Sequence, residues 1–405
     1  MIYLDYQATT PLAPEAAAAM RPWLEEGFGN PHSPHRMGRE AAAAIEVARE
    51  RVVEALNLPL RDFREGAGGG PLSFAAFHNE EPTPGPSRKS GRGGKLYFTS
   101  GATEAANWAL KGAAARLPPE RRRIVTLATE HACVLDTVDW LGSQGFDIDI
   151  LPVGRDGLVD LALAATRIDE RTGLVAAMLV NNEIGVIQPV AQLAALAREA
   201  GALVFCDAVQ ALGRVAIPLD ACDMVAVSAH KVHGPKGIGA LWVRDGVALD
   251  PLLHGGGQEG GLRSGTLSPA LCAGFGEAAR LVVEQAEADR AHAERLWTLA
   301  RNAMPGWTLN GSADHRYHGN LNFRRDGADA ARLISEVREV AFSAGSACAS
   351  GSGRPSHVLA ALGLSEREAR ASIRLGFGRY TTEADLLRAL ALIDAAAARQ
   401  LSFAA

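Results

Sequence analysis

The feature that most restricts the fold is an alternation between residues 96 and 229, where short apolar runs take turns with segments of helical periodicity. Strands that are apolar along their whole length are buried on both faces, under helices that cover a mostly parallel sheet. The pattern therefore predicts an α/β fold. We expect strands at 96–100, 124–129, 147–153, 174–180, 202–209 and 223–229, and helices at 39–58, 104–115, 132–145 and 192–201.

Polar segments come directly after several of these predicted strands. The carboxyl ends of parallel strands meet at one edge of the sheet, and ligands bind in the crevice outside that edge. We therefore expect a ligand site there, because most of the segments contain titratable or strongly hydrogen-bonding side chains. The segments are SGATEA (100–105), TEHACV (129–134), NNEIG (181–185), DAVQ (207–210) and SAHK (228–231).

Three of these side chains suit one cofactor when they are taken together. Thr103 opens a predicted helix, whose free backbone N–H groups suit a phosphate. Lys231 follows an apolar run, and burial lowers the pKa of a lysine until its amine becomes nucleophilic. Asp207 could keep a pyridine nitrogen protonated. Each has an ordinary alternative, namely a helix N-cap for Thr103 and Asp207 and a surface lysine for Lys231. The combination predicts a pyridoxal-phosphate site.

The order of the motifs resembles that of the cysteine desulfurases, which belong to the class V branch of the aminotransferase-like enzymes. The resemblance runs nearly end to end. It implies a pyridoxal-phosphate-dependent transferase of fold type I, with a large domain, a smaller α+β domain, pyridoxal 5′-phosphate as cofactor, L-cysteine as substrate and a homodimer. Its motifs are YLDYQATTP (3–11), FGNPHS (28–33), TSGATEAAN (99–107), TEHACVLDT (129–137), VNNEIGVIQPV (180–190), DAVQALG (207–213), SAHKVHGPKGIGALWV (228–243), HGGGQEGGLRSGT (254–266), SAGSACASG (343–351) and SIRLGFGRYTT (372–382).

The resemblance also implies how the cofactor would be held. Lys231 would bind it covalently, Asp207 would pair with its pyridine nitrogen, and Gln210 would hydrogen-bond its phenolic oxygen. His131 would stack on the ring and assist proton transfer. The residues assigned to the phosphate are Ala102, Thr103, Ser228, His230 and, on the neighbouring subunit, Thr266.

The resemblance assigns a further set of residues to the substrate. Arg374 would bind the substrate carboxylate through its two-pronged guanidinium. Asn182 would assist it and is assigned to the cofactor as well, and Asn30 would orient the substrate or the catalytic loop.

Cys348 lies in SAGSACASGSGRPSH (343–357), where small residues surround a single thiol. The thiolate is the reactive form, and a loop of small residues would let it approach the substrate and then turn outward. By the resemblance, Cys348 takes sulfur from the substrate as a persulfide, alanine leaves, and the sulfur passes to an acceptor such as an iron–sulfur scaffold protein. The loop resembles that of the branch serving iron–sulfur assembly or tRNA thiolation, which implies that Cys348 is also a transient iron–sulfur ligand.

Two related activities would share most of these residues, because the cofactor performs the common chemistry. A selenocysteine lyase or another class V aminotransferase or lyase is the alternative to a desulfurase. Cys348 favours the desulfurase, since an aminotransferase needs no thiol nucleophile.

Composition bears on the compartment and the partners. The chain is 47% hydrophobic with a net charge of −5, so nothing in it indicates a nucleic-acid or anionic membrane surface. We expect a cytoplasmic protein with no direct nucleic-acid or membrane partner. The other cysteines form no CxxC pair and are expected to be buried as small apolar residues; they are Cys133, Cys206, Cys222 and Cys272.

The chain is expected to form two domains. Residues 12–285 would form the large cofactor-binding domain, and residues 286–405 together with 1–11 would form the small domain with the catalytic cysteine loop. Residues 61–94 are rich in Gly and Pro and are expected to be a low-complexity insertion in the large domain.

Overall fold

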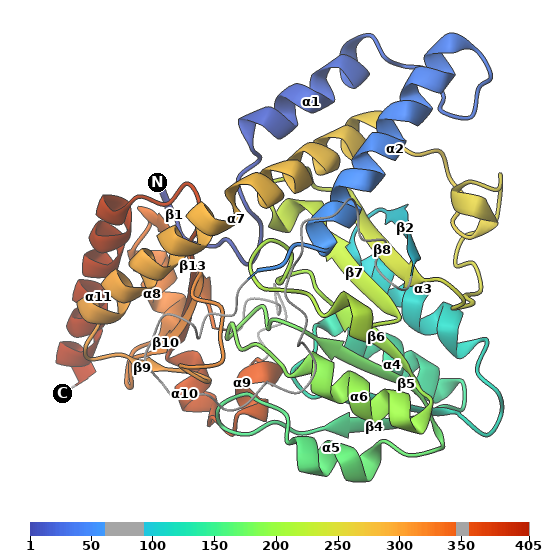
Figure 1. The fold of residues 1–405 in the computed structure, drawn as a ribbon. Coiled ribbons are helices and arrows are strands. Elements are labelled where there is room, and N and C mark those ends of the chain that lie inside the picture. The colour runs from blue at the N-terminus through green and yellow to red at the C-terminus, as the bar shows by residue number, and fades with distance from the viewer. Residues whose placement is uncertain (61–92, 346–355, 405) are drawn as a thin grey trace, which may run out of the picture.

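The computed structural model describes residues 1–60, 93–345 and 356–404. Within these ranges the chain builds a large region around a seven-stranded sheet and a small region around a four-stranded sheet. Helix α7 (Pro269–Ala303) runs from the first region to the second (Figure 1).

The large sheet has the strand order β2-β8-β7-β6-β5-β3-β4. Strands β3 to β7 are parallel, whereas β8 is antiparallel to both of its neighbours. This confirms the predicted α/β fold with a mostly parallel central sheet. The strands are β2 (Gly94–Thr99), β3 (Arg123–Leu127), β4 (Asp147–Leu151), β5 (Thr172–Met178), β6 (Leu203–Asp207), β7 (Met224–Ser228) and β8 (Gly239–Arg244).

Helices cover both faces of the large sheet because its strands are apolar along their whole length. In β5, Leu174 and Ala176 pack toward one set of helices, while Val175 and Ala177 pack toward the other. The first face carries α3 (Ala102–Ala114) and α4 (Ala132–Ser143). The second carries α2 (Arg36–Leu56), α5 (Leu161–Arg167), α6 (Val190–Ala200) and the first half of α7. Helix α1 (Pro14–Glu25) packs on α7.

Several elements were not predicted from the sequence, among them β8, α1 and α5. All but the last residue of β8 lies inside the motif 228–243. Ten residues separate it from the end of β7, and Gly239 pairs with Ser228 in the antiparallel register. A connection this short cannot hold a crossover helix, so β8 must return antiparallel.

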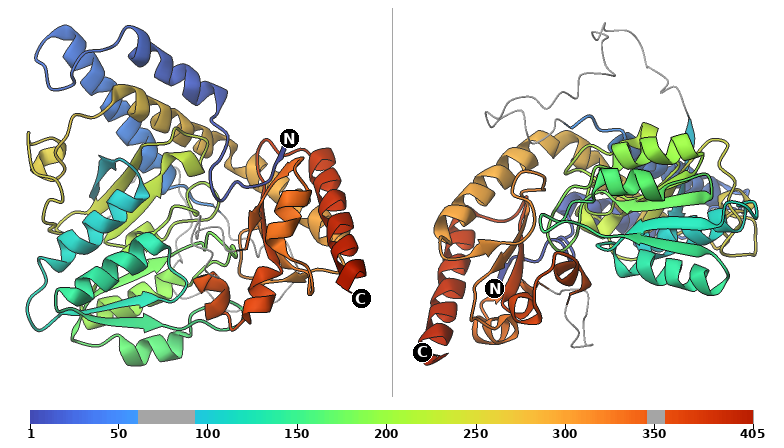
Figure 2. Two further views of the ribbon diagram at one scale, coloured as in Figure 1. Left: turned by 180° about the vertical axis from the view of Figure 1, so that it is seen from behind. Right: turned by 90° about the horizontal axis from the view of Figure 1, so that it is seen from below.

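The small region is built on an antiparallel sheet of order β12-β13-β10-β9, with a separate parallel pair β1-β11. Figure 2 shows it in orange and red beside the large region. Its strands are β1 (Ile2–Tyr3), β9 (Thr308–Leu309), β10 (Asn320–Arg324), β11 (Val340–Ala341), β12 (Ser343–Ala344) and β13 (Ser372–Gly376), and its helices are α8 (Ala330–Glu336), α9 (His357–Ala361), α10 (Glu366–Arg370) and α11 (Glu383–Ala404).

The two regions share α7. Its first half contributes Phe275 and Ala279 to the core beneath the large sheet, and its second half contributes Leu296 and Ala300 to the core of the small region. The predicted division at 285/286 falls inside this helix and stays a prediction. The expected insertion at 61–94 lies almost wholly outside the described residues. Among the helices that are described, none combines the length and the apolarity needed to cross a bilayer.

Candidate active site

The large sheet brings four polar segments to one edge. Strands β3, β5, β6 and β7 are neighbouring and parallel, so the residues after them emerge side by side. His131, Asn182 and Lys231 lie in these segments, and Asp207 is the last residue of β6. The sheet register therefore assembles the groups that the sequence predicted at strand ends.

Lys231 ends a short 3₁₀ turn (Ala229–Lys231) that follows β7 directly. Its Nζ donates hydrogen bonds to the carbonyl oxygens of Gln7 and Ala8, the latter at 2.9 Å. Gln210 Nε2 donates to the same Gln7 carbonyl at 2.9 Å. The N-terminal segment therefore lies across the edge of the sheet and draws the lysine amine and the glutamine amide together.

Asp207 and His131 lie at this edge of the sheet, and the charge of each affects the pKa of the other. Asp207 is 5% exposed, and its Oδ1 accepts a hydrogen bond from Val209 N at 2.9 Å. Burial raises the pKa of the Asp207 carboxyl, against the opposing effects of His131 and Lys231. An incoming cationic nitrogen beside Asp207 would favour the carboxylate and offset that burial.

His131 caps helix α4 with its side chain. Its Nδ1 accepts a hydrogen bond from Cys133 N at 3.1 Å, so in the neutral imidazole the proton is on Nε2. Burial lowers the pKa of His131, and the charge of Asp207 acts in the opposite direction. A neutral imidazole with its hydrogen on Nε2 can both lie against a flat ring and exchange a proton.

The first turn of α3 forms a cradle with the end of β7. A Cβ on Gly239 would lie 2.8 Å from Gly101 Cα and 2.7 Å from Val227 O, so only glycine permits this approach. Gly239 pairs with Ser228, so the end of β7 is one strand away from Gly101, the residue that precedes α3. Ala102 and Thr103 are the first residues of this helix, whose N-terminus suits an anion.

Glu104 ties this cradle to a distant loop. It accepts hydrogen bonds from Ser100 N at 2.8 Å and from Arg263 Nε at 2.7 Å. The guanidinium and the backbone N–H lower the pKa of Glu104, although burial opposes them. Thr266 is exposed three positions after this anchored arginine.

His230 turns toward the N-terminal segment. Its Nδ1 lies 3.2 Å from Thr9 Oγ1, and its backbone carbonyl accepts a hydrogen bond from Thr10 N at 2.9 Å. Burial and the neighbouring charge of Lys231 lower the pKa of His230 to about 4. The imidazole is therefore neutral at physiological pH.

Arg374 lies on β13 of the small sheet and is 1% exposed. Its Nη2 forms an ion pair with Asp5 Oδ1 at 2.8 Å, and its Nη1 donates to Asn182 O at 3.0 Å. Arg374 thus connects the N-terminal segment, the loop after β5 and the small sheet. Its forked end keeps further N–H hydrogens that could bind a second carboxylate.

Three successive carbonyls, at residues 182–184, accept hydrogen bonds from the small region; we call this segment the 182–184 loop. Asn322 Nδ2 donates to Glu183 O at 3.1 Å, and Arg316 Nη2 donates to Ile184 O at 2.6 Å. The Glu183 side chain accepts from Ser356 Oγ at the start of α9. The two regions are therefore joined directly beside Arg374.

Asn30 and Cys348 are not part of this assembly in the described structure. Asn30 is exposed between α1 and α2, and its Oδ1 accepts a hydrogen bond from His32 N at 2.9 Å. Figure 1 shows this turn beyond the outer ends of the two helices. Cys348 lies outside the described residues, as does the iron–sulfur ligation predicted for it. The described residues contain no group of three His, Cys, Asp or Glu able to hold a metal.

The remaining cysteines are buried, as predicted, and carry no disulfide. Burial raises the pKa of Cys272 to about 12 and that of Cys133 above its ordinary value. These thiols therefore stay protonated and unreactive at neutral pH.

Comparison with known proteins places the chain in a family. A model of the class-V aminotransferases matches residues 2–62 and 92–388. The chain is 39% identical over 401 residues to cysteine desulfurase IscS from Rickettsia bellii (strain OSU 85-389), across 97% of this chain and 90% of the relative. The chain belongs to the cysteine desulfurases. Pyridoxal 5′-phosphate is the cofactor of this family. The residues between the two matched segments, 63–91, belong to the Gly- and Pro-rich stretch.

Solved structures of the same kind share the whole fold. A NifS-like protein is 31% identical and superposes with a TM-score of 0.83, over 99% of each chain. SspA in complex with cysteine is 34% identical with a TM-score of 0.76, over 94% of this chain and 100% of that one. These likenesses confirm a pyridoxal-phosphate-dependent transferase of fold type I.

Sequence reasoning missed several groups in this cysteine desulfurase fold. Asp5 and Gln7 belong to the quoted motif 3–11 but were assigned no role, although they contact Arg374 and Lys231. Arg214 and Arg316 bind backbone carbonyls next to the site. Asp5 is a charged residue inside a family motif, which was an available signal, whereas Arg214 and Arg316 lie outside every quoted motif.

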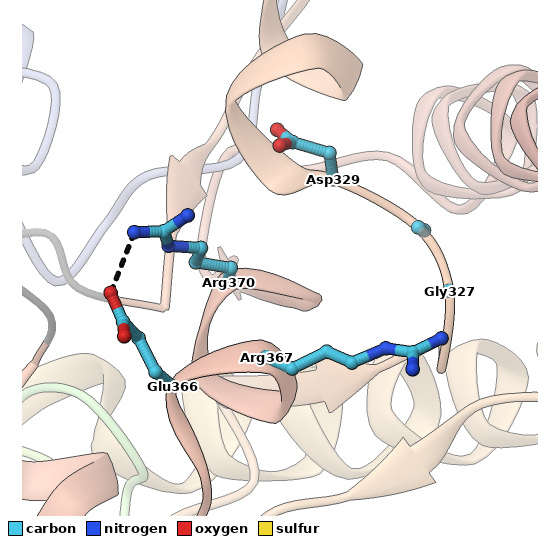
Figure 3. Close-up of a pocket in the computed structure, with 6 residues that line it drawn as sticks. Gly327, Asp329, Glu366, Arg367 and Arg370 are labelled. Atoms are coloured by element: carbon cyan, nitrogen blue, oxygen red, sulfur yellow. Dashed lines mark hydrogen bonds and ion pairs between the residues drawn. The ribbon is translucent and has the colours of Figure 1, made fainter.

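The small region also has a surface cavity of about 380 Å³ between α10 and the turn before α8. Figure 3 shows the Glu366–Arg370 ion pair on one side, with Arg367 extended toward Gly327 on the other. None of the predicted site residues lines this cavity, so we assign it no part in the desulfurase site.

Proposed function

We propose that this chain converts L-cysteine into L-alanine and transfers the sulfur to Cys348 as a persulfide. The observation that carries the proposal is the convergence of Lys231, Asp207 and His131 at one edge of the sheet in a member of the cysteine desulfurase family. A protein that only delivered sulfur carriers would have no use for this combination of amine, buried carboxylate and neutral imidazole.

The described residues fit pyridoxal 5′-phosphate. Asp207 would face the pyridine nitrogen, Lys231 would bind the cofactor covalently, and Gln210 would contact the phenolic oxygen. The cradle that a Cβ on Gly239 would fill suits the phosphate, with Ala102, Thr103, Ser228 and His230 around it and Thr266 contributed to the neighbouring subunit. When bound, the cofactor supplies an electron sink for the substrate carbon atoms.

The chain's own side chains would orient the substrate and move its protons. Arg374 would bind the substrate carboxylate through hydrogens of its forked end, with Asn182 beside it and Asn30 as an orienting residue. His131 would exchange a proton through Nε2, because Nδ1 is occupied by Cys133 N.

Sulfur transfer itself is assigned to Cys348 by family resemblance. Its thiolate attacks the substrate sulfur, the carbon–sulfur bond breaks, and the carbon retains the electron pair and takes up a proton. The products are alanine and a Cys348 persulfide, so sulfur and electrons balance without an added oxidant. We propose that the persulfide passes to an acceptor such as an iron–sulfur scaffold protein, and that the chain acts as a cytoplasmic homodimer.

The test is incubation of the purified holoenzyme with L-cysteine and a thiol reductant. We expect alanine and sulfide in equal amounts, and loss of both in Cys348→Ser although the cofactor remains bound. Pyruvate or an amino-group transfer product instead of alanine would contradict the proposal, and so would turnover of L-selenocysteine with none of L-cysteine.

A further inference from the structure

Arg214 lies seven positions after Asp207, in the turn that follows β6. It borders a small cavity of about 40 Å³ that Lys231 also lines. The charged and titratable groups that line this cavity with it are Tyr6, Lys231, His233, Asp289, Tyr317 and Arg379.

The guanidinium of Arg214 holds two residues of the site at once. Its Nη1 donates to Gln210 Oε1 and, at 3.3 Å, to the Gln210 backbone carbonyl. Its Nη2 donates to the Lys231 backbone carbonyl at 2.7 Å. The guanidinium carbon lies 5.3 Å from the centre of the Tyr317 ring, which limits its movement. One cation therefore links the glutamine side chain to the backbone of the lysine turn.

These contacts determine which way the Gln210 amide faces. A guanidinium has only donors, so the atom of Gln210 that meets it must be the oxygen. The nitrogen is then on the opposite side, where it meets the Gln7 carbonyl, an acceptor, at 2.9 Å. Reversing the amide would set donor against donor at Arg214 and acceptor against acceptor at Gln7. Both neighbours therefore select the same orientation.

The orientation matters because of where the nitrogen lies. Lys231 Nζ donates to the same Gln7 carbonyl as Gln210 Nε2, so the amide nitrogen and the lysine amine converge on one atom. An amide nitrogen carries two hydrogens, and Gln7 accepts one of them. The second hydrogen is available to an acceptor held beside the lysine.

We propose that Arg214 is a positioning residue that fixes the Gln210 amide with its N–H toward the phenolic oxygen of the lysine-bound cofactor. The inference rests on the proposed pyridoxal-phosphate function. A donor at that oxygen draws electron density from it and weakens its hold on the neighbouring imine proton. Without Arg214 only the Gln7 carbonyl selects this orientation, so the amide reverses part of the time, the donor is lost in that fraction, and the imine proton is held more tightly on average.

The test is a pH titration of the visible absorbance of the holoenzyme, which reports the imine proton without turnover. Arg214→Met keeps the apolar length of the side chain and removes its donors. We expect it to raise the titration midpoint by about 0.5–1 pH unit, which is part of the roughly 1–2 pH units that one hydrogen bond to a charged group contributes, because the amide reverses only part of the time. Arg214→Lys, which keeps a donor, should fall nearer to wild type, and the exposed Arg198→Met should leave the midpoint unchanged.

A double-mutant cycle separates positioning from a general structural role. Gln210→Ala should raise the midpoint by itself, and adding Arg214→Met to it should change the midpoint no further. Equal shifts by Arg214→Met with and without Gln210 would contradict the inference, and so would no shift in the single variant. If Arg214→Met does not fold, Arg214→Leu, which also lacks a donor, replaces it in the same cycle. A wild-type protein without the visible band would overturn the proposed function itself, and this inference with it.

Discussion

The cofactor end and the substrate end of the site are built in opposite ways. At the cofactor end, Asp207 and Ser228 end the adjacent strands β6 and β7, and Lys231 comes three residues later. The sheet register alone aligns them. At the substrate end, Asp5, Asn182 and Arg374 come from the beginning, middle and end of the chain. Short motifs close together in the sequence therefore specify the cofactor end. The substrate end forms only when the small region packs against the large one.

The two ends also differ in the groups they use. The cofactor end presents side chains into the crevice. The substrate end depends on backbone carbonyls of the 182–184 loop, which accept from Arg374, Asn322 and Arg316. Loss of a donor there leaves a buried carbonyl without that hydrogen bond. A substitution at this end should therefore weaken the contact between the two regions as well as substrate binding.

The largest effect is expected at the cofactor end. Lys231→Ala removes the amine that binds the cofactor covalently, so the visible band of the lysine-bound cofactor and all turnover of L-cysteine should disappear. Absorbance spectroscopy before and after borohydride treatment measures this. A band that persists and is reducible would show that another lysine holds the cofactor.

An intermediate effect is expected at the substrate end. Arg374→Lys keeps the charge and loses the fork, which removes a charge-assisted hydrogen bond of about 1.5–3 kcal/mol and should raise KM for L-cysteine roughly 10- to 150-fold. Steady-state kinetics measures this, with Arg370→Lys in the exposed Glu366 pair as the matched control. The visible band should remain in both variants. An unchanged KM in Arg374→Lys would remove that residue from substrate binding.

The smallest effect is expected at the join between the two regions. Asn322→Ala strips a donor from the buried Glu183 carbonyl, which should lower the free energy of unfolding by about 1–3 kcal/mol. Urea denaturation measures this, and the exposed Asn57→Ala should change stability by less than about 0.5 kcal/mol. The cofactor band should stay as in wild type. Equal stability of the two variants would mean that the 182–184 loop does not need this contact.

The same contrast explains what could be predicted from the sequence. Asp207 and Lys231 were identified because each lies at the end of an apolar strand, and strand order brings such positions together. His131 lies in another strand-end segment, but its role came from the family resemblance. The Gly-containing turn before Ala102 likewise predicted the start of helix α3, whose N-terminus suits an anion. At the cofactor end, the positions that the local sequence pattern marks are therefore also neighbours in the folded chain.

The contacts of the N-terminal segment could not be predicted in this way. Gln7 contributes a backbone carbonyl, and every residue has one, so the sequence does not distinguish it from its neighbours. Asp5 meets Arg374 through a pairing between β13 and a segment far away along the chain. The pairing of two distant segments depends on how the cores of both regions pack. A local sequence pattern does not predict that packing.

The most direct test of the central claim is a peptide-resolved mass measurement after one turnover of L-cysteine without reductant. We expect one added sulfur atom on the peptide that contains Cys348 and an equal amount of alanine. The peptides with the buried cysteines, Cys133, Cys206, Cys222 and Cys272, should gain none. Alanine formed with no sulfur on Cys348, or with sulfur on one of the buried cysteines, would contradict the assignment of sulfur transfer to this site.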